Sequence, residues 1–202
     1  MSDPADAATG PTVTTAVVLA AGASRRMGRS KPLLRWGDGT LLSHTVQTCR
    51  AAGASDVVVV VRPGEETSFA AASDARIVVN DDAHAGPGSS IRCGVAAAAV
   101  GANVLVTLCD TPLVTSSDLR RLIAAPPSAA AFDGTIGPPA CWPAESRDDL
   151  LATPNGRGGK RLLLAFGDRL TRVPIAGAAR DLDTPERYRD AYREMHGDDP
   201  PG

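Results

Sequence analysis

The sequence has few aromatic residues and little net charge. Phe, Trp and Tyr together make up 3% of the 202 residues while 43% are hydrophobic, so a buried core must be built from Ala, Val, Leu and Ile. The formal net charge of -2 gives no general attraction to nucleic acid or to a membrane surface, and we expect neither as a partner. The length fits one domain, which we place at residues 13–196, between tails at 1–12 and 197–202 that we expect to be disordered.

Closely spaced cysteines and long apolar runs are also absent from the sequence. The four cysteines lie at least sixteen residues apart, which excludes the C-x-x-C pairs of a zinc ribbon. The first twelve residues are polar and acidic, unlike a secretory signal, and no run approaches the about 20 apolar residues of a membrane helix. We therefore predict a cytoplasmic protein with reduced thiols that pack as small core residues.

Continuous apolar runs alternate with segments of helical periodicity. TAVVLA (15–20), DVVVVV (56–61) and NVLVTL (103–108) are typical of strands buried on both faces. Further strands are expected at 75–79, near 128–134 and 139–143, and at 169–175, and helices at 40–53, 65–74, 89–100, 116–125, 145–152, 158–166 and 185–195. This alternation predicts a three-layer α/β/α fold with a Rossmann-like, mostly parallel sheet, whose ligands bind at the carboxyl ends of the strands. Ser89 and Ser90 are expected to cap their helix.

A basic, glycine-containing loop follows the first expected strand. The segment AAGASRRMGRSK (20–31) places four cations around Gly22 and Gly28, and glycines let backbone N–H groups approach an anion closely. Five residues separate the two glycines and Lys31 follows three residues later, so this is not the G-x-x-x-x-G-K-[ST] phosphate loop. The G-x-G-x-x-G turn of dinucleotide-binding proteins is absent as well. The segment therefore predicts a phosphate-binding loop of another kind.

This loop and several later segments resemble, in order, the nucleotidyltransferase family that includes the molybdopterin cytidylyl- and guanylyltransferases. LAAGASRRMGRSK (19–31) is similar to the family signature L-A-[AG]-G-x-S-x-R-M-G-x-x-K. The other segments are VVNDDAHAGPGSSIRCGV (78–95), LVTLCDTPLV (105–114), GPPACWP (137–143), GRGGKRLL (156–163) and DLDTPERY (181–188), which resemble the second loop, L-x-x-D-x-P, G-x-P, G-D-x-G-A-R and D-x-D-T-P-x-D-[YF] motifs. The resemblance extends over about residues 15–195 and implies the nucleotidyltransferase (GT-A-like) form of the fold.

The resemblance also implies a reaction and a set of site residues. A phosphate on an acceptor would attack the α-phosphorus of a nucleoside triphosphate, and pyrophosphate would leave. Lys31, Arg26 and Asp110 match catalytic positions, and Asp110 and Asp183 match the carboxylates that would bind Mg²⁺ or Mn²⁺. The positions matched to nucleotide binding are Leu19, Ala20, Ala21, Gly22, Ser24, Arg26, Gly28, Lys31, Asn80, Gly88, Ser89 and Ser90. Asp181 and Asp183 are alternatively caps of the helix that follows them.

Two loops favour CTP over GTP, because cytidylyl members tend to carry A-A-G and G-x-x-x-S here. The chain has Ala20-Ala21-Gly22 and the segment 86–90, GPGSS. The expected acceptor is molybdopterin or the molybdenum cofactor, with a molybdoenzyme or its maturation factor as a further candidate partner. The segment 137–139 lacks the family's histidine and 156–161 lacks its acidic residue, so three alternatives stay open. These are a GTP-dependent guanylyltransferase, transfer to another phosphorylated acceptor, and a non-catalytic nucleotide- or cofactor-binding chaperone of a molybdoenzyme.

Overall fold

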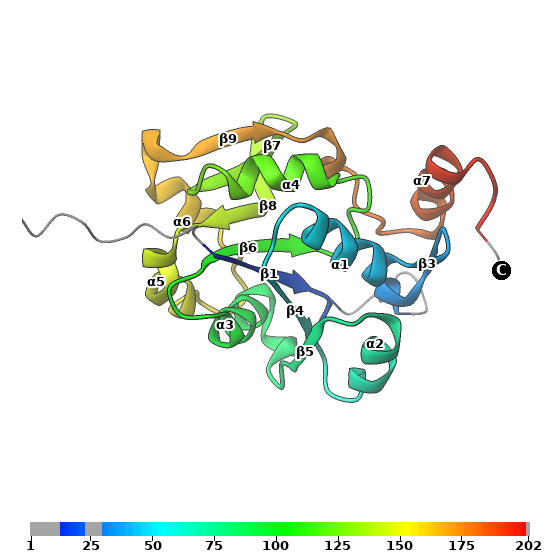
Figure 1. Ribbon diagram of the computed structural model, residues 1–202, viewed down its shortest axis with the longest axis horizontal. Helices are drawn as coiled ribbons and strands as arrows, with labels where there is room; N and C mark the ends of the chain where they lie inside the picture. The colour runs from blue at the N-terminus through cyan, green and yellow to red at the C-terminus, as the bar shows by residue number, and fades with distance from the viewer. Residues whose placement is uncertain (1–12, 23–29, 201–202) are drawn as a thin grey trace, which may run out of the picture.

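The all-apolar runs form the centre of a seven-stranded sheet in a computed structural model that describes residues 13–22 and 30–200 (Figure 1). The strand order is β5-β4-β1-β6-β8-β7-β9. Its members are β1 (Thr14–Leu19), β4 (Asp56–Val61), β5 (Arg76–Val79), β6 (Asn103–Leu108), β7 (Ser128–Phe132), β8 (Thr135–Trp142) and β9 (Thr171–Pro174). A hairpin that the apolar pattern did not predict, β2 (Arg35–Trp36) and β3 (Gly39–Thr40), lies outside this sheet.

The sheet is mostly parallel, as expected. β1 pairs in parallel with β4 and β6, β4 with β5, and β7 with β9, whereas β8 pairs antiparallel with both β6 and β7. The carboxyl ends of the six like-oriented strands and the amino end of β8 therefore lie at one edge. This edge is where a parallel sheet binds its ligands.

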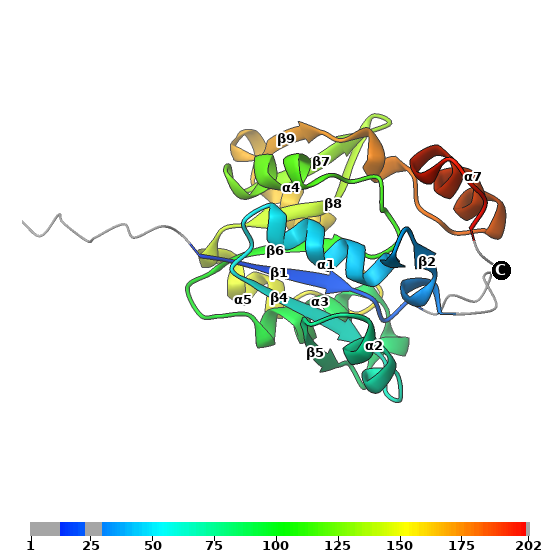
Figure 2. The same ribbon diagram turned by 45° about the vertical axis from the view of Figure 1, so that its right-hand side comes forward.

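Helices cover both faces of the sheet, which confirms the predicted three layers (Figures 1 and 2). One face carries α1 (Leu41–Ala51), α2 (Glu66–Ala72) and α4 (Ser116–Ile123). The other carries α3 (Pro87–Ala97), α5 (Arg147–Leu151) and α6 (Lys160–Ala165). The last helix, α7 (Pro185–His196), packs to the side against the β2–β3 hairpin and the start of α1.

Helix α3 begins earlier than its serines suggested. Its N-cap is Gly86, with φ of +105°, and Pro87 occupies the first turn. A proline fits there because the first N–H groups of a helix have no partner within the helix. The prediction that Ser89 and Ser90 cap this helix is therefore wrong, and both side chains lie buried inside its first turns.

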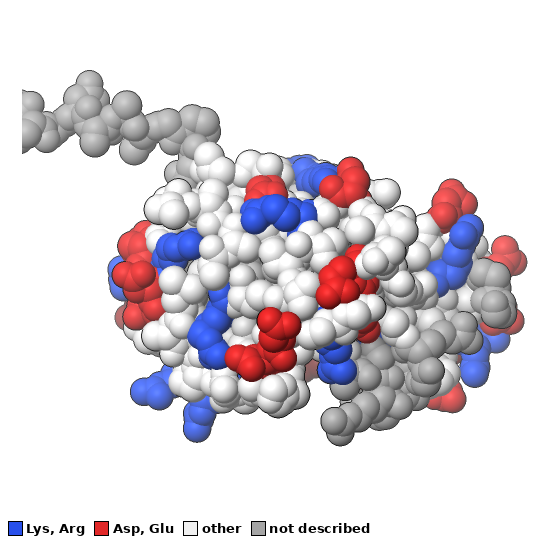
Figure 3. All heavy atoms as spheres, turned by 90° about the horizontal axis from the view of Figure 1, so that it is seen from below, with Lys and Arg blue, Asp and Glu red and all other residues white. Residues whose placement is uncertain are grey.

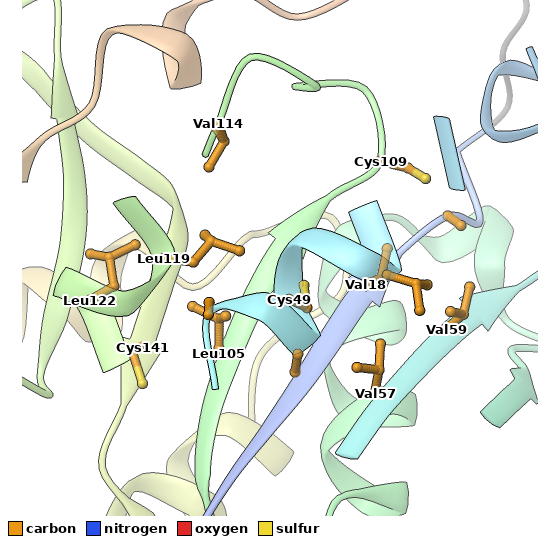
Figure 4. Close-up of a cluster of buried hydrophobic side chains, with 14 of the residues drawn as sticks. Val18, Cys49, Val57, Val59, Leu105, Cys109, Val114, Leu119, Leu122 and Cys141 are labelled. Carbon is orange, nitrogen blue, oxygen red and sulfur yellow. The ribbon is translucent and has the colours of Figure 1, made fainter. Parts of the chain in front are cut away.

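Aliphatic side chains and three cysteines form the core beneath α1 and α4 (Figure 4). Cys49, Cys109 and Cys141 are buried there, which confirms the core role expected for them. Cys93 on α3 is half-buried and donates its S–H to the Val79 carbonyl at 3.4 Å. All four cysteines are free thiols.

Charged side chains are interspersed on the face shown in Figure 3, where α2 and α3 lie. Among the described residues of this face, Lys and Arg alternate with Asp and Glu over an uncharged background. None of the helices in residues 13–22 and 30–200 has the length and apolar character needed to cross a membrane. The domain limits, the disordered tails, the cytoplasmic location and the expected lack of nucleic-acid and membrane partners stay predictions.

The burial of the four cysteines predicts how readily each thiol reacts with an external reagent. It raises the pKa of Cys49, Cys109 and Cys141 to about 12 and also raises the pKa of Cys93 above its ordinary value. Since the thiolate is the reactive form, we expect a disulfide exchange reagent at pH 8 to modify Cys93 alone, and slowly, in the native protein. All four thiols should react in guanidinium chloride. Rapid native reaction of a second thiol would contradict this packing.

Candidate active site

The first loop leaves the sheet at Leu19, the last residue of β1. Ala20 continues the pairing by donating its N–H to the Val60 carbonyl at 3.0 Å. Ala21 is 5% exposed, and its carbonyl accepts a hydrogen bond from Arg62 Nε at 2.6 Å. The methyl group of Ala21 packs into the apolar cluster beneath α3. This loop therefore starts from a rigid base at the ligand-binding edge.

The remainder of the loop is described only in part. Gly22 is the last described residue before residue 30, and an added Cβ there would meet no atom of the described residues within 4 Å. The predicted site residues Ser24, Arg26 and Gly28 lie outside the described residues. Their roles in nucleotide binding and catalysis stay predictions.

Lys31 is the centre of the site. It begins a short 3-10 helix, Lys31–Leu33, and its Nζ lies 2.7 Å from Asp110 Oδ2 and 2.8 Å from Asp183 Oδ1. Asp110 follows β6 by two residues and Asp183 precedes α7 by two. The Leu182 N–H donates to the Asp110 carbonyl at 2.9 Å, which fixes the two acidic segments against each other. The structure thus brings together three residues that the sequence placed in one site.

The protonation state of Lys31 is set by its burial and by its two carboxylate partners. Burial lowers the pKa of Lys31, but the hydrogen bonds and negative charges of Asp110 and Asp183 outweigh it and hold the pKa above its ordinary value. Lys31 is therefore protonated at neutral pH. The Lys31 side chain is 13% exposed and each carboxylate is 25% exposed, so a ligand can reach all three.

The two carboxylates fit a divalent metal. Among the described residues there is no group of three or more His, Cys, Asp or Glu side chains that could hold a metal by themselves. Mg²⁺ does not need such a cage, because it binds one or two carboxylates and takes its other ligands from substrate phosphates and water. Two carboxylates against one ammonium leave a net negative charge, which suits a cation that arrives with a triphosphate.

Asp181 and Asp183 have different roles. The Asp181 carboxylate accepts a hydrogen bond from Arg187 Nη1 at 2.6 Å, on the exposed side of α7. Thr184 is the N-cap of α7, because its Oγ1 accepts the Arg187 N–H at 3.3 Å. The alternative in which one of the two aspartates caps this helix is therefore wrong, and Asp183 is left to pair with Lys31.

The second loop is organised around Asn80, which is 5% exposed. Its Nδ2 donates to Ser89 Oγ at 2.9 Å and Ser90 Oγ at 3.0 Å, and its Oδ1 accepts the Asp82 N–H at 3.1 Å. Ser89 Oγ lies 2.8 Å from the Gly86 carbonyl. Both amide hydrogens of Asn80 are used within the protein, so this side chain shapes the loop that was matched to nucleotide binding.

Glycines bring the second loop against a later segment. A Cβ at Gly88 would collide with the Pro154 carbonyl oxygen, and a Cβ at Gly86 would lie 2.8 Å from the Gly156 Cα. Close backbone approach is the reason that glycine is required at such positions. The loop matched to the nucleotide and the segment 154–157 therefore form one wall.

A cluster of aromatic side chains and the hydrogen bonds beside it hold in place the segments that carry Lys31, Asp110 and Asp183. Trp36 packs edge-on against Tyr192 with ring centroids 5.6 Å apart, and the Tyr188 hydroxyl donates to the Arg35 carbonyl at 2.6 Å. His44 Nε2 lies 3.0 Å from the Pro112 carbonyl. Burial lowers the pKa of His44, so its neutral Nε2–H tautomer donates this hydrogen bond.

Sequence reasoning missed these supporting residues. Arg62 had a usable signal, because it directly follows the strand at 56–61 and so must lie at the ligand-binding edge. Tyr188 is the aromatic residue that ends the motif segment 181–188, but the motif gave no indication of its contact with Arg35. His44 had no signal, since it acts on a segment more than sixty residues away in the chain.

A comparison with protein families matches residues 16–172 to the MobA-like NTP transferase domain. The chain belongs to this family. It is therefore a nucleotidyltransferase, as the motifs predicted, and the α/β/α architecture is the expected one.

Two curated relatives match this chain over most of their own length. It is 34% identical over 164 residues to nicotine blue oxidoreductase of Paenarthrobacter nicotinovorans, a match that spans 74% of this chain and 80% of that protein. It is 32% identical over 184 residues to the molybdenum cofactor guanylyltransferase of Xanthomonas euvesicatoria, spanning 86% and 92%. The two relatives bear names from different reaction classes.

Among solved structures, Rv0371c of Mycobacterium tuberculosis H37Rv has a TM-score of 0.75 and 26% identity, with 90% of this chain and 99% of that chain covered. Another structure of that protein is a complex with manganese. Both findings describe that neighbour.

The geometry predicts unequal effects of two neighbouring substitutions. Asp183→Asn removes one of the carboxylates beside Lys31, so the affinity for Mn²⁺ in the presence of a nucleoside triphosphate should fall roughly tenfold or more, by analogy with losses of 10–100-fold for weaker perturbations of metal sites. Asp181→Asn, the control, removes only the pair with Arg187 and should leave the affinity unchanged. Titration followed by the electron paramagnetic resonance of free Mn²⁺ measures both. Equal losses would show that Asp183 is no ligand.

Proposed function

We propose that the protein transfers CMP from CTP to the terminal phosphate of a molybdopterin-type acceptor, with Mg²⁺ and with release of pyrophosphate. The observation that carries the proposal is the Lys31 ammonium held between Asp110 and Asp183 at the edge of the sheet, next to the loop that follows β1. Family membership supports the nucleotidyl transfer. A relative named as a molybdenum cofactor guanylyltransferase supports the choice of acceptor.

The reaction needs charge neutralisation and alignment more than covalent chemistry. An oxygen of the acceptor phosphate forms a bond to the α-phosphorus of CTP, while the bond from that phosphorus to the bridging oxygen breaks and pyrophosphate carries away the electron pair. The acceptor oxygen is already anionic near pH 7, so no side chain must remove a proton from it. Lys31, protonated and oriented by its two carboxylates, would bind the oxygens around the reacting phosphorus.

Asp110 and Asp183 would hold Mg²⁺ through their carboxylate oxygens. When bound, Mg²⁺ supplies positive charge to the phosphate oxygens. Lys31 contacts the same two carboxylates, so its ammonium would lie between the residues that hold Mg²⁺ and the nucleotide phosphates. In this arrangement the two carboxylates would orient the Lys31 ammonium toward the α-phosphorus of the nucleotide.

The preference for CTP rests on the two loops. Ala20-Ala21-Gly22 and the serines of the second loop are the features that favour cytosine. The Ala21 methyl group lies in the core, so any selection at this position would act through the backbone and its bond to Arg62. GTP is the second candidate, because relatives named as guanylyltransferases are 32% identical to this chain.

A panel of the four nucleoside triphosphates, with Mg²⁺ and molybdopterin, tests the proposal directly. We expect pyrophosphate release with CTP, dependence on molybdopterin, and loss of activity in EDTA that Mg²⁺ restores. Turnover with GTP and not CTP would overturn the choice of base. Tight binding of nucleotide and molybdopterin without any pyrophosphate would instead favour a chaperone.

Two substitutions test the named residues. Lys31→Met and Asp110→Asn should each lower kcat by about a hundredfold or more, since the first removes the cation proposed to face the α-phosphate and the second removes a carboxylate proposed to hold Mg²⁺. Arg50→Met is the control, because Arg50 pairs with Asp74 on the exposed end of α1. Activity within a few-fold of the native enzyme for Lys31→Met would remove Lys31 from the mechanism.

A further inference from the structure

A cavity of about 620 Å³ opens beside the hairpin between β7 and β8. Part of its lining comes from Phe132, Thr135, Ile136, Lys160, Leu164 and Arg172. In Figure 2 this hairpin extends beyond the sheet at the end toward which the arrow of β1 points. The cavity therefore extends from this hairpin, at the ligand-binding edge, between α6 and β9 to Arg172, which is level with Ala129 near the start of β7.

The register of the sheet relates this cavity to Asp110. β8 runs antiparallel to β6, and their pairing ends with Val106 opposite Ala140, so the residues before Ala140 in β8 lie toward the same edge as those after Val106 in β6. Ile136 in the cavity wall is one of these first residues, and Asp110 follows β6. Because β6 and β8 are adjacent strands, the start of β8 and the residues that follow β6 are neighbours at the ligand-binding edge.

A second connection leads to the loop matched to the nucleotide. The segment 154–157, against which Gly86 and Gly88 pack, continues directly to Lys160 at the start of α6. Gly159 lies between these two points, and its backbone packs closely against the Trp142 ring, because an added Cβ would lie 2.6 Å from that ring. One continuous segment therefore borders the second loop at one end and the cavity at the other.

The lining combines positive charge with apolar surface. Lys160 Nζ donates to Thr135 Oγ1, and Arg172 is exposed on the edge strand β9. Leu164 is 51% exposed, although it is a large apolar residue. Asp133, in the hairpin turn, is the acidic member of the lining. Two cations beside apolar side chains suit a ligand that is both anionic and partly apolar, such as a ring system with a negatively charged substituent.

We propose that this cavity binds the ring end of the phosphorylated acceptor, and that Lys160 and Arg172 are specificity-determining residues that pair with its negative charge. The inference rests on the proposed function, because it places the acceptor's phosphate at Lys31 and the rest of the acceptor along the start of β8. Lys160 stands where the resembling motif, G-D-x-G-A-R, has alanine. The proposed contact of Lys160 with the acceptor is therefore particular to this chain and is not part of the family motif.

The composition of the chain permits a direct test. Lys31 and Lys160 are its two lysines, while its other cationic side chains are arginines. Trace acylation with acetic anhydride, read by mass spectrometry, thus reports on the two ends of the acceptor site separately. Molybdopterin, added under anaerobic conditions, should lower the labelling of Lys160 several-fold. CTP with Mg²⁺ should lower the labelling of Lys31 and leave Lys160 unchanged.

The failure of this inference and that of the proposed function give different results. Protection of Lys160 by molybdopterin without pyrophosphate release would keep the cavity as a binding site and refute the transfer reaction. Pyrophosphate release without protection of Lys160 would keep the reaction and overturn the cavity as the acceptor site. Absence of both overturns both.

Substitutions give a second readout. Lys160→Met and Arg172→Met should each raise the KM for molybdopterin about tenfold, which is the loss of one charge-assisted hydrogen bond, and leave the KM for CTP unchanged. Lys160→Arg should restore most of the affinity. Arg50→Met is again the control, since Arg50 pairs with Asp74 at the exposed end of α1 and is not among the residues that line the cavity. Equal KM values for molybdopterin in Lys160→Met, Arg172→Met and Arg50→Met would overturn the assignment.

Discussion

The pairing of one ammonium with two carboxylates is the interaction on which the rest of this site depends. Lys31 is 79 residues from Asp110 and 152 residues from Asp183 in the chain, yet its Nζ lies within 2.8 Å of both. A charged lysine that is largely removed from water is stable only if such partners are held in place. The fold must therefore bring three distant segments to one edge of the sheet, and it does so with a strand end, a short 3-10 helix and the start of α7.

These three segments are held in place mainly by hydrogen bonds between uncharged groups. The Leu182 N–H bonds the Asp110 carbonyl, His44 bonds the Pro112 carbonyl, and Tyr188 bonds the Arg35 carbonyl. Each bond joins the backbone of one site segment to another part of the molecule, so the acidic and basic side chains are positioned without relying on their own attraction. Such support by neighbouring contacts is what keeps catalytic groups oriented when a substrate binds.

The sequence predicted the layers well because its strands are buried on both faces, which leaves an unmistakable apolar run at 15–20, 56–61 and 103–108. The reversal of β8 and the hairpin at 35–40 escaped prediction, since strand direction and two-residue strands leave little trace in periodicity. Motifs identified Lys31, Asp110 and Asp183, but they could not assign Asn80 to the support of Ser89 and Ser90, a contact between side chains that only the folded loop brings together. Lys160 was not predicted either, because its contact with Thr135 forms only when α6 packs beside the β7–β8 hairpin.

The central claim is that Asp110 and Asp183 bind the metal of a nucleotide whose α-phosphate faces Lys31. A crystal structure with Mn²⁺ and a non-hydrolysable CTP analogue, phased with the anomalous signal of manganese, measures this most directly. The account predicts one anomalous peak in contact with carboxylate oxygens of both aspartates, and the Lys31 Nζ within hydrogen-bonding distance of an α-phosphate oxygen. A peak bound by neither aspartate, or a triphosphate whose α-phosphate lies away from Lys31, would contradict it.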